Sequence, residues 1–167
     1  VYETGAYANL SARRLLEQDQ LDARDRRFAA ALIYETLSYT YTIDWILQQI
    51  SKRPLASLDP WIRTVLRMGV WQLVWSRSIP VPAAIDESVR IAADRTNRGA
   101  AGYVNAVLRN LAARPVAIPP GNVPLQTGLP PELYGHLRKW YGDEEARKLA
   151  SQSLDSVRTV TARTNRL

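Results

Sequence analysis

Apolar residues recur at intervals of three and four through the first two thirds of the chain, the spacing that one face of an α-helix produces. Asp22 precedes the first well-marked helix, in which Phe28, Ala31 and Leu32 share one face as far as about residue 38. An acidic residue at this point, with Asp25 three residues later, is typical of a helix start. Further helices are expected around residues 10–16, 40–50, 58–75, 80–92 and 103–114. The pattern therefore predicts an all-α bundle with short connections.

The segment 58–75 is expected to be the central helix of this bundle. Pro60 stands at its start, where the missing amide donor costs nothing. The segment is apolar nearly all round, which is typical of a helix buried between others. Its polar residues form a narrow line that should be exposed: Asp59, Arg63 and Arg67. The same argument assigns three tryptophans to the core: Trp61, Trp71 and Trp75.

A proline cluster marks the predicted domain boundary. Six of the ten prolines lie within residues 115–131, together with two glycines, and this composition is typical of an extended linker. We therefore predict a helical domain over 1–114 and the incomplete start of a second unit over 132–167. Since the sequence does not open with Met and ends within that unit, it is interpreted as a processed chain or an excised fragment of a longer protein.

The second unit is predicted to contain two short helices and a strand. Leu133, Leu137, Trp140 and Tyr141 are expected to share the apolar face of the first helix, which Gly142 ends. The next helix begins with acidic residues in its first turn. Residues 157–165 alternate with β-branched side chains, which favours a strand.

Composition excludes several kinds of chemistry. The chain has 167 residues, no cysteine and a single histidine, His136. Disulfides, thiolate metal sites, cysteine nucleophiles and histidine-rich metal centres are therefore excluded within it. No apolar stretch approaches the roughly 20 residues of a membrane span, and no signal peptide is evident. We expect a cytoplasmic protein without a membrane partner, and we predict no metal site and no catalytic residue in this chain.

The positive charge favours a polyanionic partner. The net charge is +6, and only three of the 22 basic residues are lysine. Arginine presents a planar fork that suits phosphate and stacks on bases. Five arginines near two consecutive helix ends form the candidate RNA-binding cluster: Arg13, Arg14, Arg24, Arg26 and Arg27. Solvated charges or local ion pairs are the alternative interpretation of each.

Five stretches resemble, in order and spacing, a known family. They are Asp25–Phe28, Ile43–Leu47, Leu66–Leu73, Ile79–Val89 and Gly102–Arg109. Together they resemble the NusB-like domain, in the version that opens bacterial small-subunit ribosomal RNA cytosine methyltransferases of the Sun/Fmu (RsmB) type, within the NOL/NOP/Sun family. The resemblance covers about residues 1–114, with most of the family's first helix missing. The following Leu129–Leu133 and Trp140–Gly142 are similar to the lead into that enzyme family's RNA-binding subdomain.

The resemblance implies an RNA-binding and targeting module. Such enzymes methylate carbon 5 of cytosine with S-adenosylmethionine, after a cysteine thiolate adds to carbon 6. Cofactor and cysteine are expected in a separate catalytic domain, so this chain would be non-catalytic and hold no cofactor. Its implied partners are ribosomal RNA, its own C-terminal methyltransferase domain and a further protein partner. A NusB-like protein–protein adapter, as in transcription antitermination or in docking the catalytic domain, is the alternative function.

Three polar residues within the resemblance are assigned to the fold rather than to RNA. Gln72 and Asn105 are expected to be buried amides that bridge helix ends. Leaving such an amide unpaired would cost about 1–3 kcal/mol. Asp25 is expected to serve the helix start, pairing with a backbone amide or an arginine.

Overall fold

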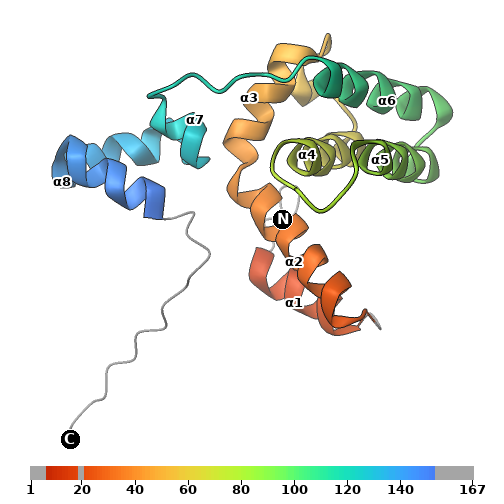
Figure 1. Cartoon of the computed structure of the whole chain (residues 1–167), viewed down its shortest axis with the longest axis horizontal. Helices are drawn as coiled ribbons and strands as arrows, with labels where there is room; N and C mark the ends of the chain where they lie inside the picture. The colour runs from red at the N-terminus through yellow and green to blue at the C-terminus, as the bar shows by residue number, and fades with distance from the viewer. Residues whose placement is uncertain (1–6, 19–20, 153–167) are drawn as a thin grey trace, which may run out of the picture.

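The structure is a computed structural model that describes residues 7–18 and 21–152, all of whose regular elements are helical. Figure 1 shows α4, α5 and α6 packed together, α1 and α2 at one end of the bundle, and α7 and α8 to one side. The elements are α1 (Ala8–Gln18), α2 (Ala23–Ser38), α3 (Thr40–Ile50), the 3₁₀ turn η1 (Leu55–Ser57), α4 (Pro60–Val74), α5 (Val81–Arg95), α6 (Arg98–Ala113), α7 (Val123–Thr127) and α8 (Pro131–Gln152). The all-α prediction is confirmed. The strand predicted at 157–165 lies outside the described residues.

Helix α4 is the buried centre of the bundle, as its sequence predicts. It packs against α2, α3, α5 and α6. Val65, Leu66 and Val70 are almost completely buried along it. Each such side chain contributes about 1.5–3 kcal/mol relative to an exposed one. At its start, the carboxylate of Asp59 accepts a hydrogen bond from the Trp61 amide at 2.8 Å.

Two side chains of α4 differ from the prediction. Arg67 is only 8% exposed, whereas an exposed polar line was expected. Its guanidinium donates to both carboxylate oxygens of Asp44 on α3, at 2.8 and 2.7 Å. Trp61 is 50% exposed rather than part of the core, and the Arg95 guanidinium lies 5.0 Å from its ring centre. Both differences arise because the burial of these side chains depends on contacts with other helices. The helical spacing of residues within α4 does not reveal those contacts.

The helix starts are set by side-chain caps in some helices but not in all. Asp22 caps α2, its carboxylate accepting from the amides of Arg24 and Asp25, both at 2.8 Å. Helix α3, by contrast, has no side-chain cap. Thr42 is buried, and its hydroxyl donates to the Leu125 carbonyl at 2.7 Å. This bond ties α3 to α7.

Part of the predicted extended linker is a short helix docked on the bundle. Residues 123–127 form α7, which packs between α3 and α8. Gly128 ends α7 with φ +74°. A Cβ at this glycine would lie 2.5 Å from the Ser38 carbonyl oxygen. The backbone of Gly128 therefore packs directly against the backbone at the end of α2. The segment therefore connects α8 to the bundle through α7, which lies next to α3 (Figure 1).

Helix α8 is broken at Gly142, where φ is +80°, as the sequence predicts. Its inward face differs from the prediction. Tyr134 packs with Val123, Ala146 and Ala150 in a small second core, with Leu129 and Leu137 against it. The predicted inward residues Leu133, Trp140 and Tyr141 are 44%, 65% and 57% exposed. His136 is also exposed and stacks on Trp140, with 5.4 Å between ring centres.

Candidate nucleic-acid interface

The predicted arginine cluster is divided between two faces of α2. Arg24 and Arg27 lie on one face, and Arg26 on another, because successive helical residues point about 100° apart. Arg26 lines a groove between α1 and α2 together with Arg13, whereas Arg24 and Arg27 line a second groove. The main chain of Arg14 lies in α1, and its side chain is outside the described structure. The four described side chains therefore line two different grooves, and their role in RNA binding stays a prediction.

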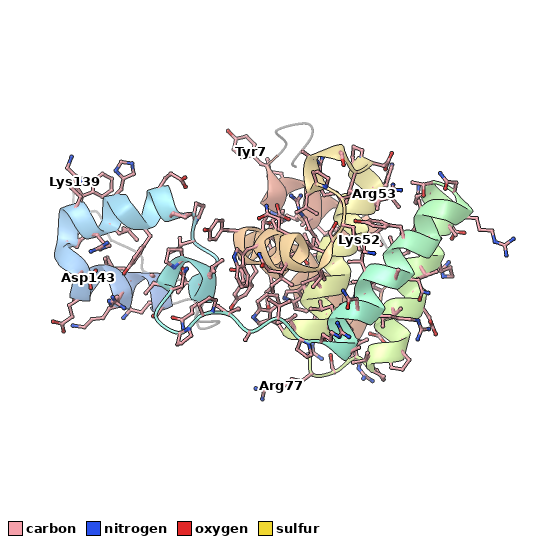
Figure 2. The ribbon with its side chains drawn as sticks, turned by 90° about the horizontal axis from the view of Figure 1, so that it is seen from above. Tyr7, Lys52, Arg53, Arg77, Lys139 and Asp143 are labelled. Atoms are coloured by element: carbon pink, nitrogen blue, oxygen red, sulfur yellow. The ribbon has the colours of Figure 1, made fainter. Side chains whose placement is uncertain are left out.

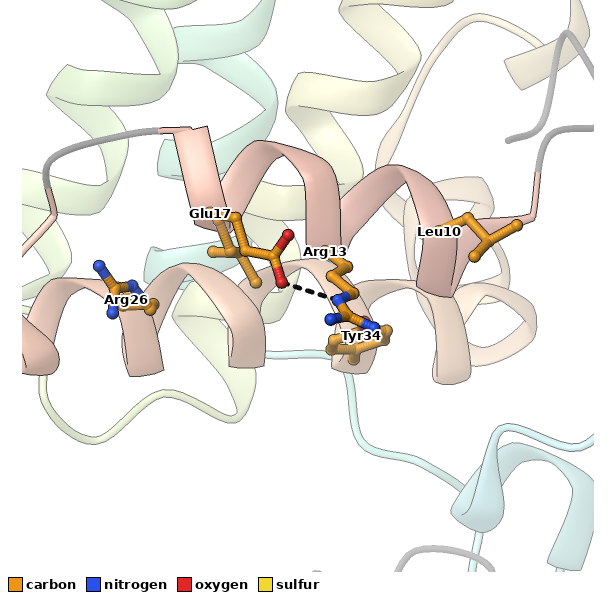
Figure 3. Close-up of a pocket in the computed structure, with 6 residues that line it drawn as sticks. Leu10, Arg13, Glu17, Arg26 and Tyr34 are labelled. Atoms are coloured by element: carbon orange, nitrogen blue, oxygen red, sulfur yellow. Dashed lines mark hydrogen bonds and ion pairs between the residues drawn. The ribbon is translucent and has the colours of Figure 1, made fainter.

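The groove between α1 and α2 offers little free positive charge. It is lined by Leu10, Arg13, Glu17, Arg26 and Tyr34, as Figure 3 shows, with Leu16 beside them. Arg13 donates through Nε to Glu17 at 2.7 Å, and this hydrogen bond and the carboxylate charge raise the pKa of Arg13. The Arg26 guanidinium donates to the Leu21 carbonyl at 3.1 Å. Both arginines thus have local partners, which is the alternative that the sequence left open.

The second groove, which we call the α2–α4 groove, combines cations with aromatic rings. It has a volume of about 650 Å³ and lies between α2, the end of α4 and the loop that leads to α5. Three exposed arginines line it: Arg24, Arg27 and Arg77. Figure 2 shows Arg77 projecting from this loop at the edge of the molecule. Arg77 is separated from the other two by some 50 positions in sequence, and nothing in the helical pattern singled it out.

Aromatic side chains form the floor of the α2–α4 groove. Phe28 and Trp71 lie with ring centres 6.4 Å apart and their planes tilted by 50°. Trp75 stacks on Tyr39 at 4.6 Å. Phe28 and Trp75 are half-buried, whereas Trp71 is buried. Partly exposed rings beside exposed guanidinium groups are a combination that binds single-stranded nucleic acid, since bases stack on rings while arginines contact phosphates.

Two carboxylates line the same groove as these arginines, those of Glu35 and Asp25. Glu35 is exposed on α2, and its Oε2 accepts a hydrogen bond from the indole Nε1 of the buried Trp71 at 3.2 Å. Burial, followed by the charge of Glu35, raises the pKa of the nearby Tyr39 hydroxyl. Sequence reasoning missed Glu35, and the signal available was its place one turn beyond Ala31 on the groove face. Asp25 lies at the mouth of the same groove, exposed in the first turn of α2.

The amides assigned to the fold make bonds within their own helices. Gln72 donates to the Met68 carbonyl at 3.3 Å in α4. Asn105 accepts from the Arg109 Nε at 2.8 Å in α6. Both are half-buried, so these bonds do not form the predicted bridges between helix ends. The role of both amides in stability stays a prediction.

The part of the chain that the structure describes contains no cluster of side chains suited to holding a metal ion. The glycine-rich segment 99–102 opens α6 directly after α5. It therefore lacks the strand–turn–helix context of the glycine-rich dinucleotide-binding fingerprint. None of the helices that are described has the length and hydrophobicity to cross a bilayer.

Comparisons with known proteins identify first the class of fold and then the family of this chain. The fold is that of the solved structure of PH0851, with a TM-score of 0.72 and 17% identity over 87% of this chain and 34% of the other. This likeness defines an all-α bundle domain that occurs within longer chains. The model of the NusB family matches residues 1–113. The chain belongs to the NusB family, as its sequence motifs predict.

Two relatives differ in how far the similarity extends. The transcription antitermination protein NusB of Halorhodospira halophila is 34% identical over 114 residues, which cover 66% of this chain and 70% of the relative. The probable ribosomal RNA small subunit methyltransferase B of Bacillus subtilis is 31% identical over 150 residues, 86% of this chain. The latter match must include residues beyond the NusB-family segment. This chain spans about a third of that relative's length (33%).

Proposed function

We propose that this chain is the RNA-binding and targeting module of an S-adenosylmethionine-dependent ribosomal RNA cytosine carbon-5 methyltransferase. The observation that carries the RNA part is the α2–α4 groove, where Arg24, Arg27 and Arg77 surround an aromatic floor. Guanidinium groups would hold phosphates and fix the position of the strand. No residue of the groove is assigned a catalytic role.

The assignment to a methyltransferase rests on the length of the similarity. A match of 150 residues to a protein named as a ribosomal RNA methyltransferase includes the region of α7 and α8, which follows the NusB-family segment. The chain has no cysteine to add to the cytosine ring. Binding of S-adenosylmethionine and the methyl transfer itself are therefore assigned to the two thirds of such a protein that lie outside this similarity.

A protein–protein adapter is the second candidate function. It is favoured by the exposed aromatic face of α8, where Trp140 and Tyr141 are more than half exposed. An apolar face of this kind suits contact with another protein surface or with the catalytic domain. Such an adapter would bind RNA weakly, and its interactions would depend little on salt.

Salt-dependent RNA binding distinguishes the two candidates. We expect fluorescence anisotropy to show this chain binding a hairpin from small-subunit ribosomal RNA, with affinity falling roughly twentyfold between about 50 and about 200 mM salt. This is the effect of three phosphate contacts to a single strand. A scrambled hairpin is the control for specificity. Equal binding to both hairpins would mean that this chain does not determine the sequence specificity. Absence of binding to either RNA at the lower salt concentration would contradict the proposal and leave the adapter.

A further inference from the structure

The α2–α4 groove contains a feature that phosphate binding does not use. A groove that serves only to hold phosphates gains nothing from a carboxylate, because like charges repel. Yet Glu35 stands in this groove with the three arginines, on an exposed position of α2. Removing the negative charge would strengthen the attraction of phosphates, so phosphate binding does not account for Glu35 or for Asp25, the second carboxylate of the groove.

The geometry fixes the Glu35 side chain in place. Trp71 is only 4% exposed, and its indole N–H donates to Glu35 Oε2 at 3.2 Å. The ring of Trp71 is in turn held against Phe28. Among the described residues, the other oxygen, Oε1, has no hydrogen-bond donor. An ionised carboxylate accepts about four hydrogen bonds, so both oxygens retain capacity for a ligand.

A fixed carboxylate beside aromatic rings selects among bases by their donors. Guanine presents two adjacent donors on its Watson–Crick edge, N1–H and the N2 amino group, which match the two oxygens of a carboxylate. Adenine and cytosine each present one amino group next to a ring nitrogen that accepts, and that nitrogen would face the carboxylate unfavourably. Uracil presents a single N3–H between two carbonyl oxygens. Unstacked bases in single-stranded RNA expose this edge to side chains.

The geometry points to a guanine-binding subsite in the α2–α4 groove. Glu35 accepts hydrogen bonds from N1–H and N2–H of an unstacked guanine, Phe28 and Trp75 provide the stacking surface, and the arginines hold the adjoining phosphates. This inference rests on the proposed function, since it assigns base selectivity to the same groove. It makes Glu35 a specificity-determining residue and Trp71 the residue that positions it.

Short RNAs that differ at one base test the subsite. The probes are fluorescein-labelled heptanucleotides of uridine whose central residue is guanosine, inosine, adenosine, cytidine or uridine, and they are titrated with the whole chain at about 50 mM salt. We expect the guanosine probe to bind about tenfold more tightly than the uridine probe, in the range of a bidentate base contact. Inosine, which lacks the N2 amino group, should fall between them.

Two variants separate base recognition from general charge. Glu35→Gln keeps the shape and an oxygen that accepts from Trp71, but it presents one donor and one acceptor to the base. It should bind the uridine probe at least as tightly as the unchanged chain and lose the preference for guanosine. Glu87→Gln, which removes an exposed carboxylate from α5 outside the groove, should keep that preference.

The outcomes are distinguishable. Equal binding of all five probes, or a guanosine preference that survives Glu35→Gln, would overturn the guanine subsite and leave RNA binding by the groove intact. Failure of every probe to bind would overturn the proposed function and the subsite together. A preference lost in both Glu35→Gln and Glu87→Gln would assign the effect to overall charge and would also overturn the subsite.

Discussion

Replacing Arg67 with methionine is expected to lower the free energy of unfolding by about 3 kcal/mol. The Arg67 side chain is 10% exposed and makes a two-pronged ion pair with Asp44, whose side chain is 26% exposed. Methionine fills much of the same space but leaves the Asp44 carboxylate without its guanidinium partner. The cost lies near the lower end of the range for breaking a buried pair, because Asp44 retains some contact with water. Urea unfolding followed by circular dichroism measures the change.

The matched controls separate loss of the pair from loss of any arginine. Arg90 also bonds an acidic partner, Glu87, but its side chain is 64% exposed, so Arg90→Met should change stability far less. The double variant Arg67→Met/Asp44→Leu should recover most of the lost stability, since it leaves no unpaired charge. Equal destabilisation by Arg67→Met and Arg90→Met would contradict the structural role assigned to the Arg67–Asp44 pair.

Gly128→Ala is expected to release α7 and α8 from the bundle. Alanine at φ +74° costs about 1–2 kcal/mol from the left-handed conformation alone. Its Cβ would also lie 2.5 Å from the Ser38 carbonyl oxygen and 3.1 Å from the Tyr39 Cα. These are backbone atoms, which cannot relieve the clash by changing rotamer as a side chain can. Relief requires α7 to move away from α3, which breaks the hydrogen bond from Thr42 to Leu125. Hydrogen exchange at the amides of α7 and α8 should therefore become markedly faster.

Gly121 provides the control for this substitution. It has a similar φ of +80°, but a Cβ there would meet nothing within 4 Å. Gly121→Ala therefore bears the conformational cost without the clash, and α7 should remain docked. If both variants accelerated exchange in α7 and α8 equally, the close contact at Gly128 would not be what holds these helices.

Much of the bundle could be predicted because its helices carry their own local signals. Asp22 caps α2, Pro60 stands at the start of α4, and Gly142 breaks α8, all as their chemistry dictates. The predictions that were wrong concern side chains whose contacts lie far away in the sequence. Arg67 fits an exposed line with Asp59 and Arg63 until the fold brings Asp44 beside it. The docked α7 depends likewise on a hydroxyl from α3.

The candidate interface could be predicted only in part. The richness in arginine draws attention to the start of α2, but proximity in sequence does not tell which face of the helix each side chain takes. Arg24 and Arg27 share a groove that Arg26 does not line. Arg77 stands alone between two serines in a loop, and Glu35 resembles any exposed acidic residue of a helix. Their significance comes from packing around Trp71, which local sequence does not encode.

The central claim, that the α2–α4 groove binds RNA, is tested most directly by removing its cations. The triple variant Arg24→Ala/Arg27→Ala/Arg77→Ala should reduce the slope of log affinity against log salt by about two for the ribosomal RNA hairpin. The control is a second triple variant, Arg13→Ala/Arg26→Ala/Arg90→Ala, which removes three positive charges outside the α2–α4 groove. It should keep most of the salt dependence of the unchanged chain. If the slope of log affinity against log salt fell equally in both triple variants, or fell in neither, RNA binding by the α2–α4 groove would be contradicted.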